Sequence, residues 1–394
     1  RITIHAFCEH PETGSVIQRA GEDRRLSKAH LTVHMGGMRA ASEFYQQTAT
    51  PNLILVETLA GGNELFGHLA SLAEVCDAGT KVVVLGHLND VSVYREMIRQ
   101  GVNEYLVTPL SPIQIIEAVS RLYVDPDAPP IGRSIAFMGA KGGTGSSTIA
   151  HNVGWCISTR MNEDVIITDL DLAFGTAGLD FNHDPAQGIA DALMAPERLD
   201  DVLLDRLLVK CSDHLSLFAA PAVLDRDLDM DSESFESVLE IVRETVPCVI
   251  VDLPHIWSPW TKKLLMSADE IVITATPDLA SLRNAKNIID LAKQTRSNDG
   301  MPHLVINQVG VPKRPEIPVK DFAEAIGIEP TLVLPFNPGL FGAAANNGQM
   351  IEELDPKNKA TEGMRYLAKQ LCGRDPMPIK AAKKSFLQRL ARRG

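Results

Sequence analysis

The segment from Gly139 to Thr148 constrains this chain more than any other part of the sequence. It reads GAKGGTGSST and separates an apolar run, 134–138, from a helix-like stretch, 149–158. Backbone N–H groups of a glycine-rich loop can converge on phosphate oxygens, and the helix that follows presents the positive end of its dipole. The segment therefore predicts a strand, a phosphate-binding loop and a helix. The alternative for this segment alone is a glycine-rich turn between a strand and a helix.

The loop shares most of the P-loop pattern G-x-x-x-x-G-K-[ST], and its glycines let the backbone approach a phosphate closely. Ser147 stands where that pattern places the hydroxyl that holds Mg²⁺. Two residues depart from the pattern, because Ala140 replaces the first glycine and Ser146 replaces the lysine that reaches the terminal phosphates. The predicted phosphate-binding residues are Gly142, Gly143, Thr144, Gly145, Ser146, Ser147 and Thr148.

The early lysine of this loop, Lys141, carries a family resemblance. The pattern K-G-G-x-G-x-[ST] resembles the deviant Walker A loop of the MinD/ParA family of ATPases. In that family the early lysine reaches across a dimer interface. The resemblance implies a homodimer that binds ATP and Mg²⁺, with Lys141 of one subunit contacting phosphate held by the other. The lysine that the family carries later in the loop is absent here.

Acidic residues follow two further apolar runs, at the strand ends where α/β proteins form ligand sites. The run 164–168 leads to Asp169 and Asp171, and the resemblance implies that Asp171 positions the attacking water while Asp169 supports the Mg²⁺ shell. The run 248–251 leads to Asp252, which fits a Walker B carboxylate that holds Mg²⁺ through water. Any one of these aspartates alone fits a helix cap or a turn equally well.

Three more apolar runs extend the predicted sheet, at residues 270–276, 303–306 and 332–335. Asn307 follows the second run and resembles the adenine-reading asparagine of the family, although a lone asparagine there is more often a turn residue. The last run, with the loop Ala345–Gly348, resembles the family's final strand and nucleotide-flanking loop. Residues 134–375 are therefore predicted to form a doubly wound α/β domain of the P-loop, MinD/ParA-like type.

Five apolar β-like runs alternate with helical patterns over residues 1–123, at 2–7, 30–33, 52–56, 81–85 and 104–107. The alternation predicts a flavodoxin-like, doubly wound sheet and resembles a response-regulator receiver domain. The receiver chemistry is degenerate, because Glu57 stands in place of the acceptor aspartate and Thr108 in place of the lysine before Pro109. We predict a protein-docking module. Transfer of label from a phosphodonor to Glu57 or a neighbouring Asp would instead favour a signalling receiver.

The two predicted domains are joined by a Pro-rich linker, residues 124–133. The chain is acidic overall, with a formal net charge of −12, but its tail, residues 376–394, contains six Lys or Arg and no acid. Apolar residues of the tail fall near helical spacing, which predicts contact with an anionic membrane surface or an acidic partner; a solubilising end is an equal alternative. The six cysteines form no C-x-x-C pair, as in a reduced cytoplasmic protein.

A receiver-like domain followed by a MinD-like ATPase domain with the loop G-A-K-G-G-x-G-S-S-T resembles the CpaE/TadZ group of bacterial pilus assembly proteins. The stretches Asp169–Gly175 and Gly188–Asp191 are also similar to that group. Membership implies a cytoplasmic factor that places the Flp (Tad) pilus secretion machine through contacts with its components, often at a cell pole and peripheral to the inner membrane. The residues by themselves support a dimerising ATP-binding switch with slow hydrolysis.

Two further functions stay open on the residues alone. A chromosome or plasmid partition ATPase would share the loop, but it needs basic patches for DNA, and the acidic body leads us to expect no nucleic-acid partner. A scaffold that does not hydrolyse, or even bind, nucleotide fits the loss of a charged donor to phosphate, which costs roughly 1.5 to 3 kcal/mol. Equilibrium binding of an ATP analogue with Mg²⁺ separates these functions.

Overall fold

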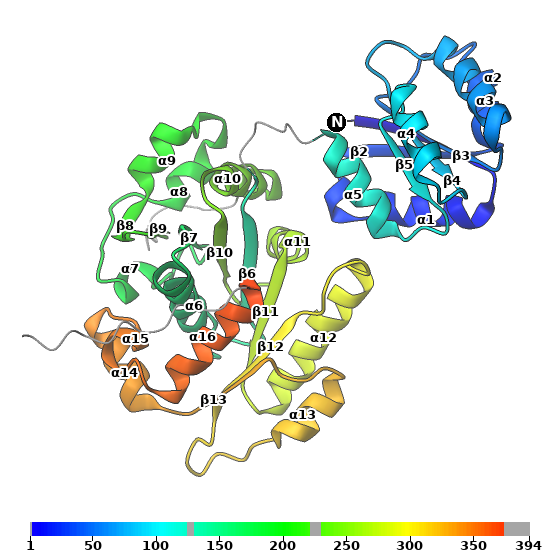
Figure 1. Cartoon of the computed structure of the whole chain (residues 1–394). Helices are drawn as coiled ribbons and strands as arrows, with labels where there is room; N and C mark the ends of the chain where they lie inside the picture. The colour runs from blue at the N-terminus through cyan, green and yellow to red at the C-terminus, as the bar shows by residue number, and fades with distance from the viewer. Residues whose placement is uncertain (1, 124–129, 221–229, 374–394) are drawn as a thin grey trace, which may run out of the picture. The chain divides into compact units, whose positions relative to one another are not determined.

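The computed structural model describes residues 2–123, 130–220 and 230–373. The chain divides into two compact units, Arg1–Ala128 and Pro129–Gly394, which Figure 1 shows in colours from blue to red. Part of the predicted linker and the whole predicted basic tail lie outside the described residues. The expected contact of the tail with a membrane surface therefore stays a prediction.

The first unit is a parallel sheet of five strands in the order β2-β1-β3-β4-β5. Its strands are β1 (Ile2–Cys8), β2 (Ala29–Met35), β3 (Leu53–Thr58), β4 (Lys81–Gly86) and β5 (Glu104–Val107). Its helices are α1 (Pro11–Gly21), α2 (Gly37–Phe44), α3 (Gly62–Val75), α4 (Val91–Arg99) and α5 (Pro112–Tyr123). This strand order is that of a flavodoxin-like doubly wound sheet, so the predicted fold of the unit is confirmed.

Strands β1, β3, β4 and β5 of the first unit send side chains into two cores. On β1, Ile4 and Ala6 pack against α1 and α5, whereas Phe7 packs against α2, α3 and α4. Parallel sheets are normally buried on both faces, and strands in them consequently read as continuous apolar runs. The same physics made the five strands visible in the sequence.

The second unit is an eight-stranded sheet in the order β13-β12-β11-β6-β10-β7-β9-β8. Its strands are β6 (Arg133–Gly139), β7 (Val165–Asp169), β8 (Val209–Ser212), β9 (Leu215–Phe218), β10 (Cys248–Leu253), β11 (Glu270–Ala275), β12 (His303–Val309) and β13 (Leu332–Pro335). All six predicted strands are present. The hairpin of β8 and β9, whose strands run antiparallel, is an addition that the sequence analysis does not predict.

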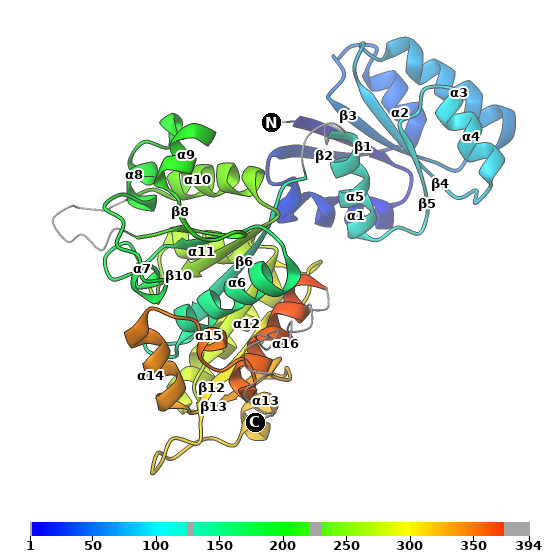
Figure 2. The same ribbon diagram turned by 60° about the vertical axis from the view of Figure 1, so that its left-hand side comes forward.

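Helices cover both faces of this second sheet. They are α6 (Ser146–Met161), α7 (Ala177–Asp180), α8 (Ile189–Met194), α9 (Asp201–Leu207), α10 (Ser232–Thr245), α11 (Pro259–Ser267), α12 (Leu279–Thr295), α13 (Val319–Ile326), α14 (Pro338–Asn347), α15 (Ile351–Leu354) and α16 (Lys359–Cys372). Helices α6 and α16 pack side by side on one face, and α8 to α13 cover the other (Figures 1 and 2). Within the described ranges, no helix has the length and apolar character needed to cross a bilayer.

Strand polarity brings the predicted site residues to one edge of this sheet. Strands β6, β7, β10, β11 and β12 run parallel, so their carboxyl ends meet at the same edge. The register places Asp252 of β10 opposite Asp169 of β7 and Thr274 of β11 opposite Gly139 of β6. The loop between β6 and α6 therefore lies among the segments that carry the predicted acids.

Candidate functional site

The loop between β6 and α6 is held from outside through its carbonyl groups. Four carbonyl oxygens accept side-chain hydrogen bonds: Gly139 from His255 Nδ1 at 2.9 Å, Ala140 from Asn284 Nδ2 at 2.9 Å, Gly143 from Gln308 Nε2 at 3.0 Å and Thr144 from Asn307 Nδ2 at 2.8 Å. An added Cβ at Gly142 or Gly143 would meet no atom within 4 Å. The loop is thus fixed on one side and open to a ligand on the other.

Gly145 makes the turn from this loop into α6. Its φ is +83°, in the left-handed region, and a Cβ there would lie 2.7 Å from Nδ2 of Asn307. Glycine is therefore required both by the backbone and by the close approach of Asn307. Helix α6 begins at the next residue, so its N-terminus points toward the open side of the loop, where a helix dipole favours an anion.

The first turn of α6 carries the three predicted hydroxyl residues. Ser146, in the place of the missing lysine, is buried, and its Oγ has no hydrogen-bond partner among the described residues. Ser147 is half-buried, as expected for a hydroxyl that a ligand could reach. Thr148 is also half-buried, and its carbonyl accepts a hydrogen bond from Asn152. The orphaned Ser146 hydroxyl is a polar atom that the protein itself does not satisfy.

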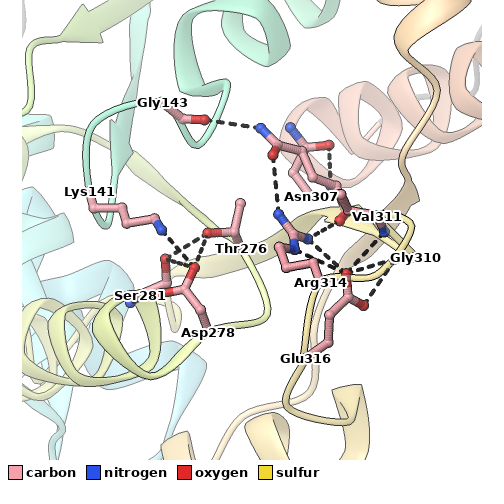
Figure 3. Close-up of polar contacts among 11 residues, drawn as sticks. Lys141, Gly143, Thr276, Asp278, Ser281, Asn307, Gly310, Val311, Arg314 and Glu316 are labelled. Atoms are coloured by element: carbon pink, nitrogen blue, oxygen red, sulfur yellow. Dashed lines mark hydrogen bonds and ion pairs between the residues drawn. The ribbon is translucent and has the colours of Figure 1, made fainter.

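Lys141 is engaged by an acid of its own unit, as Figure 3 shows. Its Nζ lies 2.7 Å from Oδ2 of Asp278, which also accepts a hydrogen bond from Thr276 Oγ1 at 2.6 Å. Burial raises the pKa of Asp278, but the contacts with Lys141, Thr276 and the Ser281 N–H outweigh it and lower that pKa to about 2. The sequence analysis does not predict this partner, although Pro277-Asp278 after an apolar run marks it as a strand-end residue.

Asp169 holds the segment that leads from β7 to α7. It is 1% exposed, and its two oxygens accept the backbone N–H groups of Asp171 and Ala177, both at 3.1 Å. Burial and then the charge of Asp252 raise the pKa of Asp169 to about 7. Asp171 is half-buried on this segment and accepts the N–H of Phe174 at 3.1 Å. Asp169 thus fixes the backbone that carries the Asp171 side chain.

Asp252 lies against a histidine that the sequence analysis does not predict. Its Oδ2 is 3.4 Å from Nε2 of His151, while Nδ1 of His151 is 2.8 Å from Oδ2 of Asp180. His151 is fully buried on α6. Burial lowers its pKa, but the carboxylates of Asp180 and Asp252 outweigh that effect and raise the pKa to about 10. The only hint in the sequence is the spacing of four residues, one helical turn, between Ser147 and His151.

The residues at this edge suit a magnesium ion that also binds phosphate and water. Asp252 is 3% exposed, and its Oδ1 has no hydrogen-bond partner in the described part of the chain. Carboxylate and hydroxyl oxygens are ligands that Mg²⁺ prefers. Across residues 2–123, 130–220 and 230–373, no group of three His, Cys, Asp or Glu could hold a metal. A Mg²⁺ here would therefore complete its shell with oxygens of a bound ligand.

A cavity of about 200 Å³ opens beside the loop. It is lined by Gly145, Thr148, Asn307, Gln308, Pro335, Phe336, Asn337, Pro338 and Phe341. Apolar rings with a few amide groups are the usual lining of a site for a flat heterocycle. The predicted base-reading residue, Asn307, has both ends of its amide engaged inside the protein, by the Thr144 carbonyl and by the Gln308 N–H at 2.8 Å. The Gln308 amide is likewise engaged, by the Gly143 carbonyl at 3.0 Å and by Arg314 Nη1 at 3.5 Å, so both amides serve to shape the cavity wall.

Gln308 is supported by the segment that follows β12. Its φ is +56°, and the register between β12 and β13 shifts between Ile306 and Val309. The Arg314 guanidinium donates to the Gln308 carbonyl and to Oε1 of Glu316, which also accepts the N–H groups of Gly310 and Val311 (Figure 3). The arginine and glutamate thus hold a non-glycine residue in a left-handed conformation next to the loop.

In the first unit, the residue at the acceptor position of a receiver is fully engaged by its own chain. Glu57 is 2% exposed at the end of β3. Its Oε2 accepts the N–H groups of Glu9 and His10 at 2.7 and 2.9 Å, and its Oε1 accepts from Thr13 Oγ1 and His10 Nδ1 at 2.7 and 2.9 Å. The carboxylate therefore ties β3 to the start of α1.

Comparison with known proteins gives relatives for both units. A family model described as an AAA domain matches residues 132–304. The septum site-determining protein MinD of Synechocystis sp. is 24% identical over 273 residues, which cover 67% of this chain and 98% of that protein. A ParA family ATPase from Chlorobium tepidum is 26% identical, with 60% of this chain and 98% of that chain covered and a TM-score of 0.55.

A third relative matches the N-terminal part of the chain. The solved structure of a pilus assembly protein, CpaE, from Caulobacter crescentus is 55% identical, with 31% of this chain and 100% of that chain covered and a TM-score of 0.31.

Proposed function

Because the chain belongs to the CpaE pilus assembly proteins, with a MinD/ParA-like ATPase domain, we propose that it binds ATP and Mg²⁺ and dimerises to place or assemble a Flp (Tad) pilus secretion machine. The observation that carries the proposal is the loop from Gly139 to Thr148, fixed through four carbonyls and open toward the N-terminus of α6. We further propose that it acts in the cytoplasm, at a cell pole and peripheral to the inner membrane, through components of that machine.

The nucleotide would lie along the carboxyl edge of the second sheet. The loop residues 142–148 would hold its phosphates, and the cavity beside Asn307 and Gln308 would receive its base. Ser147 and Asp252 would hold Mg²⁺, the first through its hydroxyl and the second through water, with Asp169 in the surrounding shell. The unpartnered Oδ1 of Asp252 supports this assignment, since a buried oxygen without a donor awaits a ligand.

Slow hydrolysis would follow from the charge that the loop lacks. Ser146 provides no cation to the terminal phosphates, so a positive group must come from elsewhere. Lys141 of a second copy would supply it, and Asp171 would position the attacking water. In the unit described here Lys141 is paired with Asp278, so that pair must open before Lys141 reaches another subunit.

Exposed apolar side chains around the loop support a second copy as the dimer partner. Phe174, Trp257 and Leu279 are 71%, 54% and 73% exposed and follow β7, β10 and β11 respectively. All three therefore come from the strand ends that surround the loop. Large apolar side chains gathered at one site usually mark an interaction surface. A homodimer across this edge would cover them and bring Lys141 toward the opposite nucleotide.

Titration calorimetry of the full chain with a non-hydrolysable ATP analogue tests the proposal. We expect a magnesium-dependent heat of binding for the wild type. Gly145→Val is the variant that should lose binding. Its side chain would collide with Asn307, and valine rarely adopts the left-handed backbone conformation that this position requires. It should lose binding at least about tenfold. Absence of heat with the wild type at millimolar Mg²⁺ would leave a scaffold that binds no nucleotide.

Asp278→Asn should favour the dimer. The substitution removes the charge that holds Lys141 but keeps a side chain that caps α12, because asparagine and aspartate are equally good N-caps. A partly exposed ion pair is worth up to about 1 kcal/mol, so the dimer dissociation constant with the ATP analogue should fall about three- to fivefold. Sedimentation equilibrium measures it. Asp290→Asn, on the same helix, should leave the constant unchanged, and equal effects of both variants would contradict the prediction.

A further inference from the structure

A buried histidine connects two acids of the site that lie on different elements. His151 is on α6, Asp252 on β10 and Asp180 at the end of α7. The imidazole is 0% exposed, with Nδ1 2.8 Å from Asp180 and Nε2 3.4 Å from Asp252. Helix α6 packs against both α7 and β10. His151 thus links Asp180 of α7 to Asp252 of β10.

The chemistry of the two neighbours fixes what this ring does. Both carboxylates offer acceptor oxygens, and each faces a different nitrogen of the ring, Nδ1 toward Asp180 and Nε2 toward Asp252. The ring therefore bridges the two acids. It lies on the same helix as Ser146, the residue that stands where the ammonium group of a P-loop is normally found.

The contact with Asp252 leaves room for a further ligand. Nε2 of His151 and Oδ1 of Asp252 each lack a hydrogen-bond partner among the described residues, since the 3.4 Å contact to Oδ2 is an ion pair without hydrogen-bond geometry. Both atoms are fully buried. One oxygen of Asp252 is therefore drawn toward the histidine while the other remains available. This is how an outer residue orients a carboxylate that acts on a metal shell.

We infer that His151 is a positioning residue, which orients the Asp252 carboxylate toward Mg²⁺ and couples it through Asp180 to the segment that carries Asp171. The inference rests on the proposed function, because it concerns the magnesium of the same site. It adds a role for α7, whose Asp180 anchors the ring. The position of the acid that acts on the metal thereby depends on the position of the segment between Asp169 and α7.

Two amide substitutions separate the two contacts of the His151 ring, because each keeps one contact and loses the other. In His151→Asn the amide nitrogen takes the place of Nδ1 and keeps the bond to Asp180, whereas in His151→Gln it takes the place of Nε2 and keeps the contact with Asp252. Loss of an outer partner typically weakens metal binding about 10- to 100-fold. We expect that loss for His151→Asn, which releases Asp252, and a smaller loss of about three- to tenfold for His151→Gln, which releases only Asp180.

The measurement is a magnesium titration of the full chain with a fluorescent ADP analogue, alongside the affinity for the analogue in EDTA. The affinity in EDTA should stay within about threefold of wild type for both variants, because neither touches the phosphate loop. A purely structural role of His151 would lower the melting temperature of both variants and leave their magnesium midpoints equal. Equal midpoints for His151→Asn and His151→Gln would overturn the inference.

Asp180→Asn provides a second test if the His151→Asn chain does not fold. It removes the charge that holds Nδ1 but keeps an acceptor, so we expect a magnesium midpoint about three- to tenfold higher. An unchanged midpoint would again overturn the inference. If the wild type binds the analogue with magnesium and the variants match it, the inference fails and the proposed function stands. If the wild type shows no magnesium-dependent binding, both fail.

Discussion

Replacing Lys141 by alanine should lower the rate of ATP hydrolysis at least about 100-fold, the usual effect of removing one group that stabilises charge in the transition state. The effect should be large because Ser146 supplies no second cation. The affinity for ADP should change less than about threefold, since Lys141 points to Asp278 within its own unit. The rate is measured as phosphate release by the purified full chain, at a protein concentration well above the dimer dissociation constant.

Two companion variants make this result specific. Lys262→Ala removes an exposed lysine of α11 and should leave the rate unchanged. Asp171→Ala should reduce the rate as strongly as Lys141→Ala, if it positions the attacking water. Mixing Lys141→Ala with Asp171→Ala subunits should restore part of the activity, because each mixed dimer then contains one site with both residues. Hydrolysis that is equally fast in all of these proteins would refute the roles assigned to Lys141 and Asp171.

Replacing Glu57 by alanine should reduce the free energy of unfolding of the first unit by about 3 to 5 kcal/mol, because each buried donor left without an acceptor costs about 1 to 3 kcal/mol. The variant leaves the N–H groups of Glu9 and His10, and the Thr13 hydroxyl, without their acceptor. Hydrogen exchange of residues 2–123 within the full chain follows the loss. Glu74→Ala, an exposed change on α3, should alter exchange by less than about 0.5 kcal/mol.

The contribution of Glu57 should also depend on pH. Burial raises its pKa, but the hydrogen bonds from His10, Thr13 and Glu9 outweigh burial, so the folded pKa lies below the ordinary value of 4.5. A carboxyl group with a lowered pKa stabilises the fold above the unfolded pKa and loses that contribution as the pH falls through the folded pKa. The difference between wild type and Glu57→Ala should therefore shrink in acid below about pH 5. It should also decrease as the pH rises above the ordinary imidazole pKa of 6.5, because Glu57 raises the pKa of the His10 ring that it contacts. A difference that grows as the pH falls below about 4 would contradict this assignment.

The sequence predicts the central strands well but misses the edge formed by β9 and β8, for one physical reason. Strands such as β6 and β10 are buried on both faces and read as unbroken apolar runs. The hairpin of β8 and β9 is short, and β8 is only partly buried, so Lys210 and Ser212 interrupt its apolar pattern. The local composition of the hairpin is typical of a loop as much as of a strand. Its strand structure depends on the pairing of β9 with β7.

The site residues show a similar division. A motif identifies the residues that meet a ligand, such as the loop glycines, because their spacing is set by the ligand. It does not identify the groups that hold those residues, since these come from elements outside the motif: Asp278 from the turn between β11 and α12, Gln308 from β12 and His151 from the second turn of α6. The engaged amide of Asn307 illustrates this limit, because its hydrogen bond to Thr144 depends on the packing of β12 against the loop.

The four side chains that hold the carbonyls of the loop from Gly139 to Thr144 have a thermodynamic consequence. Freezing a flexible backbone costs roughly 1 to 2 kcal/mol for each residue, and a ligand that must order its own binding loop loses that amount from its affinity. Here folding has already imposed the order, through His255, Asn284, Gln308 and Asn307. The site is preorganised, and the entropy thereby spared offsets part of the attraction that an ammonium group at position 146 would have given.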